Sequence, residues 1–175
     1  PDYALTLESA DLSFTSSGSQ PWVVDNTNAV AGGSSSAKSG PIDHSQSSTL
    51  QTIVQGPGSG SFNWKVASEA GYDGVTFYID DVEQDNISGT IDWQAYNFVV
   101  ADGPHTLKWV YSKDGSVSRS PDAAWVDQLS YLRSLPFADV SANAWSAKYV
   151  SKLYYSGITK GCADGMYCPG QTVNR

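Results

Sequence analysis

The sequence predicts a mainly β protein, an antiparallel, jelly-roll-like β-sandwich followed by a short C-terminal appendage of α-helix and loop. Three observations support this fold class. Apolar and polar residues alternate along most of residues 1–132, and turn-forming clusters interrupt the alternating stretches. After residue 134 the apolar period changes to that of a helix. We therefore expect a sandwich over residues 1–134 and a separate appendage over residues 135–175.

The alternating segments define about eight strands joined by long loops. Turn formers separate them at residues 56–60, 80–81, 102–104 and 113–115. Residues 31–39 are rich in Gly and Ser, and we expect them to form a loop and a short strand of small residues within the sandwich. The expected strands are Ala4–Phe14, Trp22–Asp25, Ser48–Gln55, Ser61–Ser68, Gly74–Ile79, Trp93–Val100, Thr106–Tyr111 and Ala123–Tyr131.

Two of these strands indicate which side chains face the core. Alternate residues of a strand point to opposite faces of the sheet. The sequence therefore predicts one inward row in each strand, Phe62, Trp64 and Val66 in the first and Val75, Phe77 and Ile79 in the second.

The appendage is expected to contain a helix of about fourteen residues. Ser141 is a suitable N-cap, and Gly157 can end the helix in a left-handed conformation. Trp145, Tyr149 and Leu153 are four residues apart and form one apolar stripe. We expect this stripe to be packed as core rather than to stack on sugars.

Charge excludes some partners. The formal net charge is −8, with −11 on residues 1–132 and +3 on residues 133–175. The sandwich should therefore repel nucleic acid and anionic lipid. No apolar run is long enough to span a membrane. The six Trp, ten Tyr and many hydroxyl residues suit an exported β-rich protein.

The two cysteines, Cys162 and Cys168, lie close together in the sequence. Outside the cytoplasm such a pair is expected to form a small-loop disulfide. Free thiols and a metal site are the alternatives, but a metal site would need further ligands, and His44 and His105 are distant in sequence.

The appendage resembles an S-layer homology (SLH) repeat. This resemblance implies noncovalent attachment to cell-wall polysaccharide and a location outside a bacterial cell. It also implies that three such repeats form one unit, so we expect the anchor to be completed beyond Arg175 or by another chain. Arg175 would be the residue that contacts the polysaccharide. The matching residues are Leu135-Pro136-Phe137-Ala138-Asp139-Val140, Trp145, Leu153, Gly157-Ile158, Gly161, Tyr167, Pro169 and Val173-Asn174-Arg175.

Residues 5–132 resemble the jelly-roll modules of bacterial surface proteins, which include MAM-type, adhesin and carbohydrate-binding sandwiches. This resemblance implies a fold, and the fold does not define a ligand. The pattern is carried by Leu7-Glu8, residues 61–69, Phe77-Tyr78-Ile79-Asp80, Ser88-Gly89, Trp93, residues 103–111 and residues 122–127.

The same resemblance implies a structural Ca²⁺ between the first and last strands. Glu8 and Asp127 stand at the positions of the two carboxylate ligands, with Asp25 or Asp122 as a third. Carboxylate oxygens suit this ion. The alternative is that these residues are solvated surface acids.

Aromatic side chains on one sandwich face could bind pyranose rings. The candidates are Tyr78, Trp93, Tyr96 and Trp125, and packing in the core is the alternative for each of them.

No sequence pattern indicates catalysis. Asp80 and Asp81 are adjacent and suit a hairpin turn, and His105 lies at a turn. Neither a Gly-x-Ser-x-Gly nor a His-Glu-x-x-His motif occurs. We therefore expect a non-catalytic accessory region of a cell-envelope protein. The alternatives are a carbohydrate-binding module of a secreted hydrolase, or a structural subunit of a surface layer or filament whose sandwich faces pair between copies.

Overall fold

Two long strands, β4 (Ser47–Ala67) and β7 (Thr90–Ser112), form the centre of the molecule. A computed structural model describes residues 1–119 and 121–171. Within these residues the chain forms eight strands and two short helices. In chain order they are α1 (Tyr3–Thr6), β1 (Phe14–Gly18), β2 (Val23–Asp25), β3 (Ser36–Lys38), β4 (Ser47–Ala67), β5 (Gly74–Ile79), β6 (Val82–Ser88), β7 (Thr90–Ser112), β8 (Ala123–Arg133) and α2 (Ala147–Tyr155).

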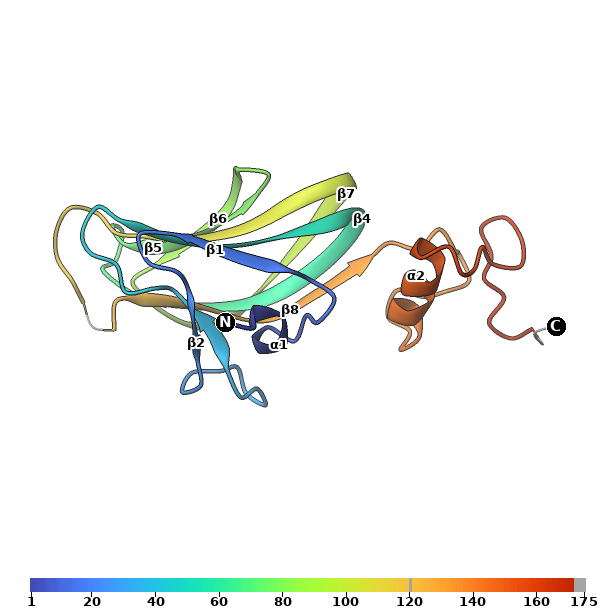
Figure 1. Ribbon diagram of the computed structural model, residues 1–175, viewed down its shortest axis with the longest axis horizontal. Coiled ribbons are helices and arrows are strands. Elements are labelled where there is room, and N and C mark those ends of the chain that lie inside the picture. Colours follow the sequence, from blue (N-terminus) through green and yellow to red (C-terminus); the bar gives the residue numbers. More distant parts are fainter. Residues whose placement is uncertain (120, 172–175) are drawn as a thin grey trace.

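Strands β4 and β7 pair with each other along nearly their whole length and bend together, so that each contributes to both layers of the sandwich (Figure 1). Layer A contains β4 residues 47–56 and β7 residues 103–112, together with β1, β5 and β6. Layer B contains β4 residues 58–67 and β7 residues 90–100, together with β8, β3 and β2. All of these pairings are antiparallel, which confirms the predicted fold class, a mainly antiparallel β-sandwich.

Close backbone contacts explain why glycines occupy the bend. A Cβ atom added to Gly56 would lie 1.7 Å from the carbonyl oxygen of Ala101, and one added to Gly58 would lie 2.2 Å from the hydroxyl of Tyr131. Only a residue without a side chain fits there. The sequence predicted a turn between two strands at this point, but the chain continues as one bent strand.

The core lies between the two layers and is built from aromatic rings. Phe62 is fully buried, and its ring centroid lies 4.8 Å from that of Phe77 and 5.1 Å from that of Trp109. Trp64 and Val66 are also buried, as is Val75, and Ile79 packs against the same cluster. The predicted inward rows of both strands are therefore confirmed.

The N-terminal strand predicted over Ala4–Phe14 is wrong. The chain instead forms helix α1, whose first turn is capped by the Asp2 carboxylate accepting from the Leu5 N–H (3.1 Å), and enters the sheet only at β1. Strand β6 was not predicted because its outer residues are polar. The predicted hairpin turn at Asp80–Asp81 is confirmed, and both residues adopt a positive φ there.

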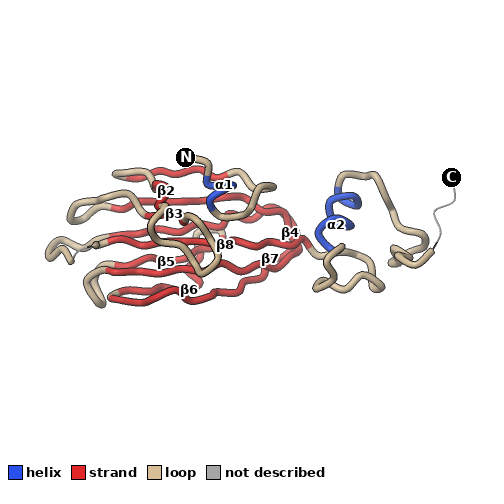
Figure 2. The backbone as a smooth tube through the Cα atoms, turned by 90° about the horizontal axis from the view of Figure 1, so that it is seen from below, coloured by secondary structure: helices blue, strands red, loops and turns tan. Residues whose placement is uncertain are grey.

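The C-terminal segment lies beyond the bent end of the sandwich (Figures 1 and 2). Helix α2 has nine residues rather than about fourteen, its N-cap is Ser146, and the chain leaves it through Gly157 at φ 75°. Neither helix in the described part of the chain is long and apolar enough to cross a membrane.

Candidate functional site

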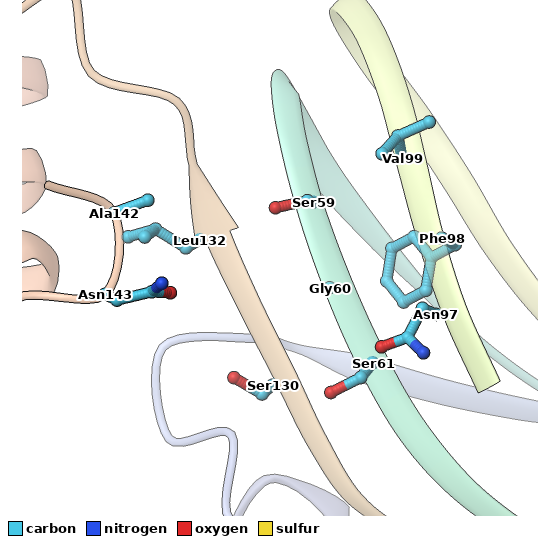
Figure 3. Close-up of a pocket in the computed structure, with 10 residues that line it drawn as sticks. All are labelled: Ser59, Gly60, Ser61, Asn97, Phe98, Val99, Ser130, Leu132, Ala142 and Asn143. Atoms are coloured by element: carbon cyan, nitrogen blue, oxygen red, sulfur yellow. The ribbon is translucent and has the colours of Figure 1, made fainter. Parts of the chain in front are cut away.

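A cleft of about 470 Å³ lies between the outer face of layer B and the C-terminal segment. Neighbouring strands β4, β7 and β8 supply its floor, and a loop before α2 supplies one wall (Figure 3). In Figure 3 the side chain of Asn143 extends from that loop toward β8. The lining residues are Ser59, Gly60, Ser61, Asn97, Phe98, Val99, Ser130, Leu132, Ala142 and Asn143.

Chemically, the cleft offers hydroxyl and amide groups beside a comparable apolar surface, and no ionisable side chain. Hydroxyls both donate and accept hydrogen bonds, and amides present one group of each kind. Such a surface suits a neutral polyhydroxylated ligand. The sequence did not predict this cleft, because no aromatic or charged motif marks its floor and the loop at Asn143 completes it from a distant part of the chain. The signal available was the outward parity of Ser59, Ser61 and Asn97 on adjacent strands.

A larger groove of about 960 Å³ lies between residues 8–12, strand β8 and helix α2. Polar contacts join the two parts of the chain around Arg133. The Arg133 guanidinium lies 3.5 Å from the ring centroid of Tyr155. The main-chain carbonyl of Arg133 accepts a hydrogen bond from the Ser151 hydroxyl (3.3 Å). On the helix surface, Lys152 pairs with Asp11 at 2.6 Å.

The predicted ligands Glu8 and Asp127 come together. Residues 7–9 run beside residues 127–129, because the Leu129 N–H donates to the Leu7 carbonyl (3.1 Å) and the Ser9 hydroxyl donates to the Leu129 carbonyl. Burial raises the pKa of Glu8, and the negative charge of Asp127 raises it further. The negative charge of Asp127 therefore acts on the carboxylate of Glu8, which is an exposed residue.

Asp127 is fully buried and has no cationic partner among its hydrogen bonds. Its two carboxylate oxygens accept only main-chain N–H groups, from Val30 (2.8 Å) and Gln128 (2.8 Å). Burial raises its pKa, which these two hydrogen bonds partly oppose. Glu8 and Gln128 also adopt positive φ angles, 54° and 49°, which are uncommon outside glycine and concentrate at functional sites.

The other two predicted metal ligands have different partners. Asp25 accepts from the Thr27 N–H (2.8 Å) and the Trp125 indole N–H (2.8 Å). Burial raises the pKa of Asp25, but these hydrogen bonds outweigh it and bring the pKa down to about 2. Asp122 pairs with Lys113. Among the described residues, no group of three or more His, Cys, Asp or Glu is arranged to hold a metal. A cation at Glu8 and Asp127 would therefore need main-chain oxygens or water to complete its shell.

The four predicted sugar-binding aromatics do not converge, and none of them lines either space described above. Trp125 is 1% exposed, under the Nζ atoms of Lys38 and Lys65. The other three are partly exposed. Tyr96 packs against the core, Trp93 lies at an irregularity in β7, and Tyr78 lies under the Nζ atom of Lys108 (4.9 Å). Arg175 lies outside the described residues.

The C-terminal loop is closed by a disulfide between Cys162 and Cys168, as predicted. The Asp139 carboxylate accepts from the N–H groups of Tyr167 (2.8 Å) and Cys168 (2.7 Å) and so ties this loop to the chain before α2. The prediction that Trp145 and Tyr149 are core residues is wrong, since their side chains are 84% and 53% exposed.

The hairpin groups considered for catalysis lie away from both the cleft and the groove. The Nδ1 atom of His105 is hydrogen-bonded to the Asp80 carboxylate (2.6 Å), which raises the pKa of His105 and contributes to lowering that of Asp80. Neither residue lines the cleft or the groove. This pair therefore fixes the turn and does not face a bound ligand in either space.

Residues 136–175 match the family model of the S-layer homology domain. The match confirms the predicted resemblance of the tail and indicates a protein associated with the cell surface or cell wall. No curated protein matches the chain.

Several solved structures share the fold of the sandwich. The secreted serine protease VesC from Vibrio cholerae is 16% identical with a TM-score of 0.59, over 75% of this chain and 27% of that chain. The K1 cleaved adhesin domain of Lys-gingipain from Porphyromonas gingivalis W83 is 14% identical with a TM-score of 0.51, over 70% and 91% of the two chains. TmCBM61, solved in complex with β-1,4-galactotriose, is 17% identical with a TM-score of 0.50, over 69% and 88%. At these identities the likeness shows the fold alone, and this chain spans about a quarter of the length of VesC.

Proposed function

We propose that this chain is a non-catalytic accessory region of a bacterial cell-envelope protein, in which the sandwich recognises a glycan and the tail belongs to a unit that anchors on cell-wall polysaccharide. The observation that carries the glycan proposal is the cleft between layer B and the C-terminal segment. It is large enough for sugar rings, and its lining combines hydroxyl and amide groups with apolar surface and carries no charge.

The anchoring part of the proposal rests on the SLH match over residues 136–175. An extracellular location is supported by the Cys162–Cys168 disulfide, because disulfides persist in oxidising compartments. We take residues 1–134 as the recognition module and residues 135–175 as part of the anchor.

The glycan-binding part is supported by TmCBM61, which shares the sandwich fold and was solved with a β-1,4-linked galactotriose. Because fold alone does not define a ligand, the choice of residues comes from the cleft itself. Asn97 and Asn143 supply amides from opposite sides, and Ser61 and Ser130 supply hydroxyls between them.

We further infer that Glu8 and Asp127 hold a structural Ca²⁺. Their oxygens are the ligands this ion prefers, and a cation would relieve the repulsion between these two carboxylates, one of them fully buried. When bound, the ion would hold residues 7–9 against β8. Asp25 and Asp122 are not included, because other side chains of the protein already pair with them.

The glycan proposal is tested with Asn97→Ala in the cleft and Gln94→Ala as the matched control. Gln94 is an exposed residue of the same strand outside the cleft. Binding to purified bacterial cell-wall polysaccharide and to β-1,4-galactotriose is measured by calorimetry, after equal melting temperatures show that both variants are folded. Loss of one amide should weaken binding about 3–10-fold, corresponding to roughly one hydrogen bond. The proposal fails if Asn97→Ala binds as tightly as Gln94→Ala, or if the wild type binds neither probe.

A further inference from the structure

The loop between β4 and β5 contains a second pair of acidic residues, distant from the C-terminal segment (Figure 1). Its backbone forms a closed turn, because the Asp73 N–H donates to the Glu69 carbonyl (3.1 Å). The Ser68 hydroxyl donates to the Asp73 carbonyl (2.7 Å) and accepts from the Gly89 N–H (3.1 Å). These hydrogen bonds therefore fix the backbone of Glu69 and Asp73 at the two ends of one turn.

Each of these acids has a buried oxygen without a hydrogen-bond partner. Asp73 is fully buried, and its Oδ1 accepts from the Asp114 N–H (2.8 Å), whereas its Oδ2 has no donor. The Oε2 atom of Glu69 is likewise buried without a donor. Buried carboxylate oxygens are normally hydrogen-bonded or paired with a cation, so two orphans in one turn require a partner.

The neighbouring lysine does not supply that partner. Lys113 precedes Asp114, but its Nζ atom pairs with Asp122 and donates to the Ser118 hydroxyl (2.8 Å). The Tyr111 hydroxyl donates to the same Asp122 carboxylate (2.9 Å). The Lys113 ammonium group and the Tyr111 hydroxyl therefore both contact Asp122 and not the carboxylates of the turn.

We propose that Glu69 and Asp73 form a second cation site, which takes Ca²⁺ and is separate from the site proposed at Glu8 and Asp127. An oxygen-only donor set selects a hard cation, and Ca²⁺ accepts carboxylate, main-chain and water oxygens in flexible geometry. Two carboxylates without a third acid favour weak binding, in the range of about 10⁻⁴–10⁻³ M seen for extracellular modules. The ion would fix the β4–β5 loop and, through Asp73, the chain at Asp114.

The test measures Ca²⁺ stoichiometry on the full chain by equilibrium dialysis with radioactive calcium at neutral pH. The variants are Glu69→Gln, Glu8→Gln, and Glu83→Gln as a control that removes one exposed acid from β6. We expect Glu69→Gln to bind one ion fewer per chain than Glu83→Gln. Glu8→Gln should keep the Glu69-dependent ion, so that failure of the proposed Glu8–Asp127 site is distinguishable from failure of this one.

Hydrogen exchange supplies a readout that is independent of ion counting. Ca²⁺ should slow exchange in residues 68–73 by at least threefold in the wild type and in Glu8→Gln, and should not do so in Glu69→Gln. Equal stoichiometry in Glu69→Gln and Glu83→Gln would overturn the proposal. Equal protection of residues 68–73 with and without Ca²⁺ in the wild type would also overturn it.

Discussion

Removing calcium should destabilise the sandwich, by an amount that the ligand concentration relative to its Kd determines. Asp127 is fully buried with two main-chain N–H donors and no cation, while Glu8 lies close enough for its charge to be felt. A ligand that binds only the folded state at 100 times its Kd stabilises that state by about 2.7 kcal/mol. For a chain of this length, this corresponds to a rise in melting temperature of about 5–10 °C.

The effect should depend on pH in a defined direction. Burial raises the pKa of both Glu8 and Asp127 above the ordinary carboxyl value of about 4. As pH rises from about 4 through these raised values, the unfolded chain releases protons before the folded one does. In the metal-free protein, the stability that these two groups contribute therefore falls over this window. Calcium requires the deprotonated carboxylates, so the calcium-induced rise in melting temperature should be larger at pH 7 than at pH 4.

The assay is thermal unfolding followed by circular dichroism, in excess EDTA and in excess Ca²⁺. Glu8→Gln should respond less to calcium than the wild type, keeping only the response of the Glu69–Asp73 site. It should be no less stable than the wild type in EDTA, because it removes a negative charge near Asp127. Asp43→Asn removes an exposed acid elsewhere and should respond as the wild type does. An unchanged melting temperature when EDTA is added to calcium-loaded wild type would refute the reasoning, as would an equal response of Glu8→Gln.

Three further outcomes follow from the packing. Phe62→Ala should destabilise the protein by about 3–5 kcal/mol in urea unfolding, since the ring is fully buried, whereas Ile53→Ala, 60% exposed, should change stability by less than about 1 kcal/mol. Lys113→Met should cost about 3 kcal/mol by the same measurement, because it leaves the Asp122 carboxylate without its cation; a neutral effect would contradict the buried ion pair. Trp145→Ser should change stability by less than about 0.5 kcal/mol, since the ring is 84% exposed, and a large loss would place the ring in the core instead.

The parts of the fold that the sequence predicted are those that local alternation determines. The inward row of Phe62, Trp64 and Val66 follows from the two-residue period of a strand, because one face of each strand is buried. Glycine and proline, however, mark both a turn between strands and a bend within one. Residues 56–60 belong to a bend, because β4 pairs with β7 on both sides of it, and this pairing is a long-range property that local sequence does not encode.

The candidate sites show the same division. That residues 7–9 lie beside β8 could be expected, because Glu8 and Asp127 stand near the two ends of the sandwich sequence at positions that the resemblance defines; a metal between them stays a prediction. Trp125 occupies an outward position, but lysines and an aspartate from three other segments cover it, so parity alone could not show that it is buried. The cleft was missed because the loop at Asn143 forms one of its walls, and the sequence did not indicate that this loop lies against layer B.

Helix α2 shows why an apolar stripe is not sufficient evidence of a core. The helix buries Ala147, Val150 and Ser151, which are three and four residues apart, against the rest of the chain. The predicted stripe of larger residues begins with Trp145, which precedes the helix, and Tyr149. Their ring centroids lie 6.2 Å apart, and both residues are exposed. Small residues allow close approach to the sandwich, whereas these large aromatics form an apolar surface that the described residues leave uncovered. This arrangement is expected if the tail is one part of a larger anchoring unit, because its large apolar residues would then pack against further repeats rather than against the sandwich.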